Sequence, residues 1–130
     1  MTLERTRAER AVRLAGDTFR VFPLTSYLRA LREEPAYAAN GRNGITLVKT
    51  ARLRVLLEVL RAGTRLAEHR APGPITVQVL EGAIRCHTEE EVFRVREAEI
   101  LALPAGQPHS VEAVGDAAFL LTITVEEGKA

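Results

Sequence analysis

The chain of 130 residues has little cysteine and no long apolar run. Its single cysteine, Cys86, excludes a disulfide within the chain, which favours a reducing compartment. The amino-terminal residues lack the apolar core of a signal peptide, and no run reaches the roughly 18 apolar residues of a membrane helix. The net charge of +1 gives no indication of nucleic-acid binding. We therefore expect a cytoplasmic protein without membrane or nucleic-acid partners.

Several motifs that carry chemistry are also missing. There is no glycine-rich phosphate loop and no cysteine spacing of the zinc-finger type. Ser110 adjoins His109, but neighbouring residues of a strand point to opposite faces, so a serine nucleophile with this histidine as its base is disfavoured. What remains is a single globular domain with 46% hydrophobic residues, enough for one core.

The first third of the chain has helical patterns. Weak helical periodicity runs over residues 3–15, and a second helix is expected over residues 24–34, where the apolar side chains share one face. This second helix should end before Pro35, because the residue preceding proline avoids the α region. We therefore expect residues 1–44 to form a helical or extended segment that packs on the following domain or on a partner subunit.

After residue 44 the pattern changes to short apolar runs separated by glycine and proline. The expected strands cover residues 45–49, 53–60, 75–80, 83–87, 92–95, 100–103, 110–114 and 117–125. Many short strands with turn signals between them are typical of an all-β sandwich or closed barrel, here over residues 45–127.

The first two expected strands, residues 45–49 and 53–60, are apolar on both faces. A strand with one solvated face should instead alternate apolar and polar residues. A second layer must therefore cover them, either the helix over residues 24–34 or another subunit. On this basis we expect a homodimer.

One conspicuous stretch begins at Gly63 and ends at Gly82. His69 follows Gly63 after five residues, Ala71 comes two residues later, and Ile75 follows Ala71 after three more residues. Gly82 closes the stretch after a further six residues, at a turn where glycine tolerates a positive φ.

A second stretch runs from Ala98 to Ala113. Five residues separate Ala98 from Pro104, Gly106 follows after one residue, and His109 follows after two. The proline and glycine turn the chain, so that His109 begins the next strand.

These two stretches resemble the paired motifs of the cupin superfamily, in particular its small single-domain bacterial members. Fifteen residues separate the stretches, and the resemblance covers about residues 45–125. It implies a double-stranded β-helix, the jelly-roll barrel. It also implies that the two motif-bearing strands lie side by side, so that His69 and His109 converge in the barrel mouth.

In cupins four positions of these motifs hold a metal, and here they are His69, Ala71, Ile75 and His109. Ala71 replaces an imidazole and Ile75 replaces a carboxylate. Because protein metal sites usually use three or four ligands, the resemblance implies either no cofactor or a weakly bound divalent metal such as Fe, Mn, Zn or Ni. His69 and His109 are the remaining candidate metal ligands.

Four other residues nearby have metal-binding or polar side chains. Strand parity predicts that Glu68 and Gln78 face away from the barrel interior. Cys86 is expected to be a small buried side chain, and His87 is expected to be exposed. None of these residues restores the missing pair of ligands.

The residues of this region favour a protein that binds a small molecule. His69 and His109 supply polar groups, and Ile75 and Val77 are expected to line an apolar interior, although such side chains also simply fill the core of small barrels. The alternative is a metal-dependent oxygenase or isomerase, and a third reading is an interaction module whose basic leading segment docks a partner. Whether the protein is an enzyme stays open, and no catalytic residue is assigned.

Overall fold

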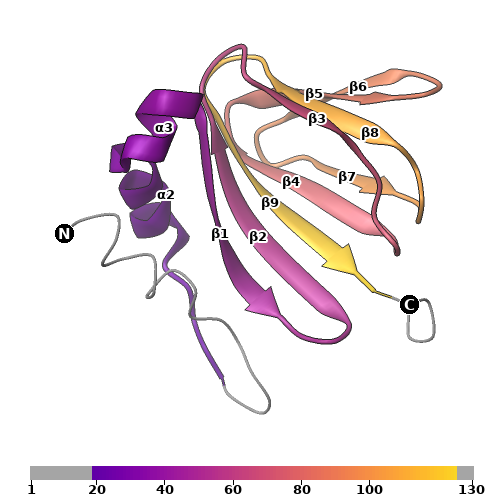
Figure 1. The fold of residues 1–130 in the computed structure, drawn as a ribbon, viewed down its shortest axis with the longest axis horizontal. Helices are drawn as coiled ribbons and strands as arrows, with labels where there is room; N and C mark the ends of the chain where they lie inside the picture. The colour runs from indigo at the N-terminus through magenta and orange to yellow at the C-terminus, as the bar shows by residue number, and fades with distance from the viewer. Residues whose placement is uncertain (1–18, 126–130) are drawn as a thin grey trace.

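Two antiparallel sheets face each other in the computed structural model, which describes residues 19–125 (Figure 1). The five-stranded sheet has the order β1-β2-β9-β4-β7, and the four-stranded sheet has the order β3-β8-β5-β6. The strands are β1 (Arg42–Lys49), β2 (Leu53–Leu60), β3 (Arg65–His69), β4 (Ile75–Glu81), β5 (Ala83–Thr88), β6 (Val92–Arg96), β7 (Ile100–Leu103), β8 (His109–Ala113) and β9 (Ala117–Thr124). The expected all-β barrel is confirmed, whereas the helix expected over residues 3–15 lies outside the described residues.

Two helices lie against the outer face of the five-stranded sheet, α2 (Leu24–Glu33) and α3 (Pro35–Asn40) (Figure 1). Leu28 and Leu31 of α2 are buried in a cluster with Leu47 of β1 and Leu57 of β2. Burying one such side chain contributes roughly 1.5–3 kcal/mol, so this layer is a substantial part of the fold. The chain's own helix thus covers the second apolar face of β1 and β2, and the homodimer remains a prediction.

The α3 helix is an element that sequence reasoning did not predict. Pro35 ends α2 as expected, but it also occupies the first turn of α3. Proline is well accepted there because its missing N–H would have no partner within the helix. The helical segment therefore continues as far as Asn40, and the first barrel strand begins at Arg42, before the expected start at residue 45.

The main core lies between the two sheets. Alternate residues of β4, namely Ile75, Val77 and Val79, are buried there together with Phe119 of β9. This confirms their inward parity. The two sheets approach each other at the end next to α3 and spread apart away from it (Figure 1).

Two tight turns explain the spacing of the sequence motifs. Gly82 joins β4 to β5 with φ 73°, and a Cβ at this position would overlap the carbonyl oxygen of Asp116. Ala98 joins β6 to β7 with φ 69°, the one non-glycine residue with a positive φ among residues 19–125. Both motif positions thus adopt the left-handed conformation that favours glycine.

Candidate ligand site

His69 and His109 lie side by side on neighbouring strands of the four-stranded sheet. They are direct cross-strand partners in the antiparallel pair β3·β8. Their ring centroids are 4.3 Å apart, and the rings meet edge to face at 61°. The two rings are therefore in direct contact, but only His69 is among the residues that line the cavity described below.

A bulge in β3 decides which way His69 faces. Leu66 pairs with Val111 and His69 pairs with His109, so β3 has one more residue than β8 between these two pairs. In a regular strand Leu66 and His69, three positions apart, would point to opposite faces, since side chains alternate along a strand. The bulge places both on the inner face of the sheet.

The same bulge changes the position of Glu68. Simple alternation predicts that Glu68 faces away from the barrel, but this residue lines the cavity beside His69. Glu68 lies within the bulge between Leu66 and His69, where strict alternation is interrupted, so parity counted from His69 does not fix its position. Gln78, in the regular strand β4, is exposed as expected.

Both rings are held in the same tautomer. The Nδ1 atom of His69 lies 3.1 Å from the carbonyl oxygen of Ala67, and that of His109 lies 3.0 Å from the carbonyl oxygen of Gln107. Since a carbonyl oxygen only accepts hydrogen bonds, each Nδ1 carries the proton and donates it. In each neutral ring the Nε2 atom is then an acceptor with a lone pair.

The two histidines differ in their exposure to solvent. His69 is exposed, whereas His109 is 1% exposed and lies beside it within the barrel. Burial lowers the pKa of His109 below its ordinary value of 6.5. The hydrogen bond with Gln107 is the next largest effect and raises this pKa. The nearby His69 lowers the pKa further, and the negative charge of Glu68 raises it. His109 is therefore neutral at neutral pH.

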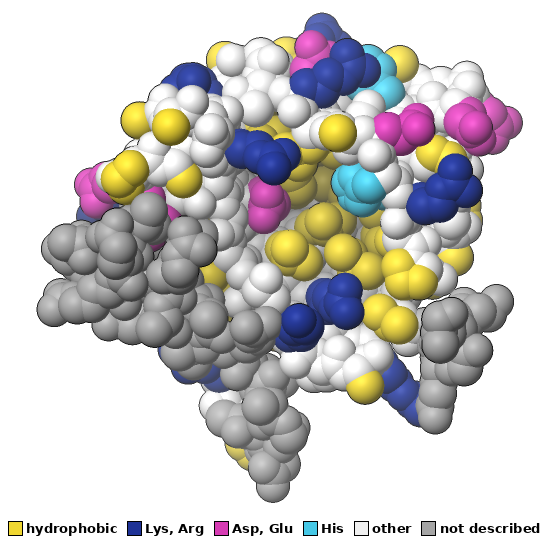
Figure 2. Space-filling view, viewed as in Figure 1, with side chains coloured by type: hydrophobic (Ala, Val, Ile, Leu, Met, Phe, Trp, Pro, Cys, Tyr) yellow, Lys and Arg dark blue, Asp and Glu magenta, His cyan; other side chains and the backbone are white. Residues whose placement is uncertain are grey.

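A cavity of about 620 Å³ opens beside His69, between β3 and the five-stranded sheet. Three leucines from three strands, Leu56, Leu66 and Leu121, give it an apolar lining. Figure 2 shows hydrophobic side chains in the hollow between the sheets, with histidine, basic and acidic side chains around its rim. The charged lining residues are Arg42, Glu58 and Glu68.

Sequence reasoning did not name Arg42 and Glu58 as site residues, and it predicted that Glu68 faces away from the barrel interior. Glu58 could have been recognised from the sequence, because it has the same inward parity as Leu56 and Leu60 and interrupts an otherwise apolar stretch of β2. Arg42 precedes the expected start of the first strand, and the position of Glu68 depends on the bulge. Neither of these two residues can be recognised from local periodicity.

Ile75 and Val77 occupy a different place from the one their expected role requires. They are 2% and 1% exposed in the core, and neither is among the residues that line the cavity. The leucines of β2, β3 and β9 provide the apolar contact surface instead. The binding role of Ile75 and Val77 stays a prediction.

Comparison with known proteins identifies the family. A cupin domain model matches residues 56–126, more than half of the chain. This chain belongs to the cupin family. Among solved structures, this cupin is similar to a conserved protein of unknown function from Streptococcus pyogenes, with a TM-score of 0.70 and 26% identity over 87% of this chain and 93% of the other.

Two further cupin relatives have longer chains. Salicylate 1,2-dioxygenase from Pseudoaminobacter salicylatoxidans, solved as adducts with gentisate, has a TM-score of 0.69 and 25% identity over 78% of this cupin and 32% of the dioxygenase. A Cupin 2 conserved barrel domain protein from Leptotrichia buccalis has a TM-score of 0.61 and 30% identity over 64% of this cupin and 40% of the other chain. No curated protein sequence matches. Within residues 19–125, neither helix has the length and hydropathy needed to cross a bilayer.

The donor set of this cupin does not fit a tightly bound metal. Ala71 and Ile75, at the other two ligand positions, are buried hydrocarbon side chains. Across residues 19–125 no group of three or more His, Cys, Asp or Glu side chains is arranged to hold a metal ion. Two imidazoles alone fall short of the usual three or four protein ligands.

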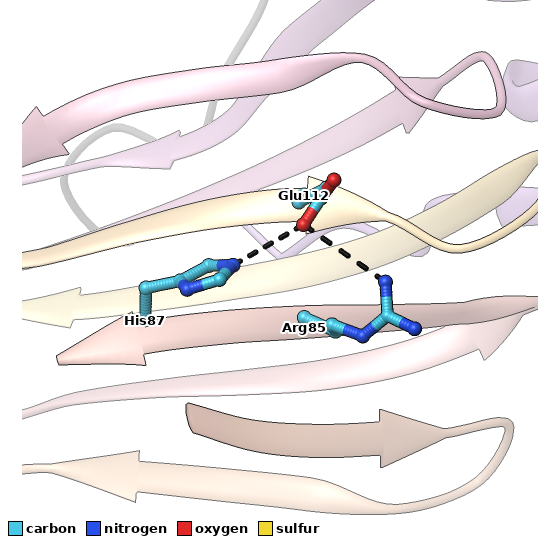
Figure 3. A network of polar contacts seen from close by, with 3 residues as sticks. All are labelled: Arg85, His87 and Glu112. Carbon is cyan, nitrogen blue, oxygen red and sulfur yellow. Dashed lines mark hydrogen bonds and ion pairs between the residues drawn. The ribbon is translucent and has the colours of Figure 1, made fainter. Parts of the chain in front are cut away.

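The remaining histidine and the cysteine lie away from the pair. His87 of β5 faces outward, where its Nε2 lies 3.2 Å from Glu112, and Arg85 lies 4.0 Å from the same carboxylate oxygen (Figure 3). Cys86 is fully buried in the core, and this burial raises the pKa of its thiol to about 11. Neither side chain can complete a site with His69 and His109.

Proposed function

We propose that this cupin binds a small organic molecule in the cavity at the barrel mouth, in contact with His69, and holds no metal tightly. The observation that carries this proposal is the pair of imidazoles, 4.3 Å apart and each with its Nδ1 bound to the backbone, beside a cavity of about 620 Å³. Cavities of this size with apolar walls and a few oriented polar groups suit small ligands.

The ligand gains from both parts of the site. Contact with Leu56, Leu66 and Leu121 removes apolar surface from water. The Nε2 atom of His69 accepts a hydrogen bond from one polar group of the ligand and so orients the ligand. The neighbouring His109 supports the ring of His69 from the buried side. Because the backbone carbonyls already hold both rings, little side-chain freedom is lost on binding.

The proposal is tested with three probes of the same size, namely benzyl alcohol, benzylamine and benzoate. Amide chemical shifts of the uniformly labelled protein are followed while each probe is added. At least one probe should shift the signals of Leu56, Leu66 and Leu121. His69→Ala should weaken its binding about tenfold, which corresponds to the loss of one hydrogen bond to a polar partner. His109→Ala should also weaken binding, because the ring of His69 then loses its support.

His87→Ala is the matched control, because this histidine lies on the outer face of the same sheet. It should leave binding unchanged. If none of the three probes shifts signals from the cavity, or if binding is indifferent to His69 and His109, the proposed function is wrong.

A metal-dependent oxygenase or isomerase is the second candidate, favoured by the similarity to salicylate 1,2-dioxygenase. Metal analysis of the purified protein separates the two candidates. We expect substoichiometric metal after dialysis, and higher occupancy when Ala71→His and Ile75→Glu together restore the four ligands. Full occupancy of the unmodified protein that survives a chelator would instead support the enzyme.

A further inference from the structure

His69, the histidine of the pair that lines the cavity, offers an acceptor to a ligand rather than a donor. Each Nδ1 proton is already donated, to Ala67 by His69 and to Gln107 by His109. In a neutral ring that donates through Nδ1, the Nε2 atom holds a lone pair. A ligand that brings only acceptors, such as a carboxylate, would face lone pairs without an intervening proton.

The charged residues of the cavity favour the same kind of ligand. Glu68 directly precedes His69 and lines the cavity with it, and the negative charge of Glu68 acts on His109 as well. Glu58 is the second carboxylate of the lining, and it lies over Gly44, where a Cβ would overlap its oxygen.

Arg42 is the opposing charge. It pairs with Leu60 at the start of β1, next to α3, and the rung formed by Gly44 and Glu58 follows two residues further along the same face. Glu58 therefore lies between Arg42 and the rung of Leu56.

Building on the proposed function, we infer that the ligand is a small primary amine on an apolar body. A protonated amine has three donors and no acceptor. It can donate to the Nε2 of His69 and to the carboxylate of Glu68 at once, and hydrogen bonds of a charged donor are about twice as strong as neutral ones. The apolar body then lies against Leu56, Leu66 and Leu121.

Benzylamine and benzoate test this inference, because they share the ring and differ in the polar group. Affinities are measured by chemical-shift titration at about pH 8, where the amine is charged and imidazoles are neutral. Benzylamine should bind about tenfold more tightly than benzoate, the factor expected for one charge-assisted hydrogen bond in place of an unmatched acceptor. His69→Ala and Glu68→Gln should each reduce this preference to within about threefold.

Glu89→Gln is the matched control for Glu68→Gln, because it removes the same charge from the exposed turn between β5 and β6. It should leave the preference for the amine unchanged. Equal or tighter binding of benzoate that depends on His69 would overturn the amine assignment and leave the proposed function standing. A preference for benzylamine that survives both His69→Ala and Glu68→Gln would also overturn the assignment. Failure of all three probes to bind in the cavity would instead overturn the proposed function.

Discussion

At the scale of single residues, Ala98 adopts a backbone conformation that alanine disfavours. It begins the second motif stretch and has φ 69°, in the left-handed region that favours glycine. The turn is held against β4, because the N–H of Ala98 donates to Val79 at 2.8 Å and the N–H of Val79 donates to Glu99 at 3.0 Å. The backbone therefore keeps this conformation although alanine disfavours it.

We expect Ala98→Gly to raise the free energy of unfolding by about 0.5–1 kcal/mol. Removing the Cβ relieves about 1–2 kcal/mol of left-handed strain, and the greater freedom of glycine in the unfolded chain offsets part of it. Urea denaturation measures the change. Ala105→Gly is the control, because Ala105 has no positive φ. Ala105→Gly should lower the free energy of unfolding by about 0.4–1 kcal/mol. A decrease of the same size for Ala98→Gly would contradict the argument.

His109 links one side chain to the pH dependence of stability. Its folded pKa lies below the ordinary 6.5, chiefly because of burial. Below about pH 6.5 the unfolded state therefore binds more protons than the folded state. The stabilising effect is complete above this pH and is lost as the pH falls.

We expect the free energy of unfolding to decrease between about pH 7 and pH 5, and His109→Gln to make this part of the profile flatter. Urea denaturation at a series of pH values gives the two slopes, which can be compared even if the substitution lowers stability as a whole. His87→Gln serves as the control. A slope unchanged by His109→Gln would show that this histidine is not the titrating group.

At the scale of the elements, the turns set how β-strands meet. Gly63 and Gly82 both have positive φ, 82° and 73°. They differ in space, because a Cβ at Gly63 would meet nothing within 4 Å, whereas a Cβ at Gly82 would overlap the carbonyl oxygen of Asp116. One backbone conformation thus occurs once in open space and once in a packed corner.

This pair separates strain from crowding. Gly63→Ala should cost about 1 kcal/mol, from the left-handed conformation alone. Gly82→Ala should cost about 3 kcal/mol or more, because the backbone of the turn before β9 must also move. Thermal and urea denaturation of the two variants measure the difference. Equal losses would mean that the corner relaxes without cost.

At the scale of the whole molecule, the apolar surface that remains uncovered bears on the oligomeric state. The α2 helix covers β1 and β2, so the strands themselves no longer require a partner. Among residues 19–125, the large apolar side chains left exposed include Phe19 at 97%, Val21 at 92% and Ile100 at 61%. Exposed apolar groups of this kind are typical of surfaces between subunits.

We therefore expect a homodimer in light scattering at micromolar concentration, held partly by the segment that contains Phe19 and Val21. Replacing both with serine should shift the equilibrium toward the monomer, since less apolar surface is then buried on association. Val92→Ser is the control, because Val92 is also exposed but lies on β6 of the four-stranded sheet. A monomer for the unmodified protein would contradict the prediction.

The sequence by itself determined the architecture. Alternation and turn residues predict most of the strands, and the resemblance of the two stretches to the cupin motifs implies that His69 and His109 meet. These features are local or depend on counting residues between turns, so they can be read along the chain. The strand β3 escaped this reading, because Arg65–His69 contains one large apolar side chain, Leu66.

Only the tertiary structure decided what surrounds the histidine pair. The bulge in β3 puts Leu66 and His69 on the same face, and Glu68, which lies within the bulge, lines the cavity beside His69. The cavity is lined by α3, β1, β2 and β3, which follow one another in the chain, and by β9, which lies far from them in the sequence. Backbone carbonyls select the tautomers of both rings. Such properties depend on how separate segments pack, and periodicity within one segment carries no information about them.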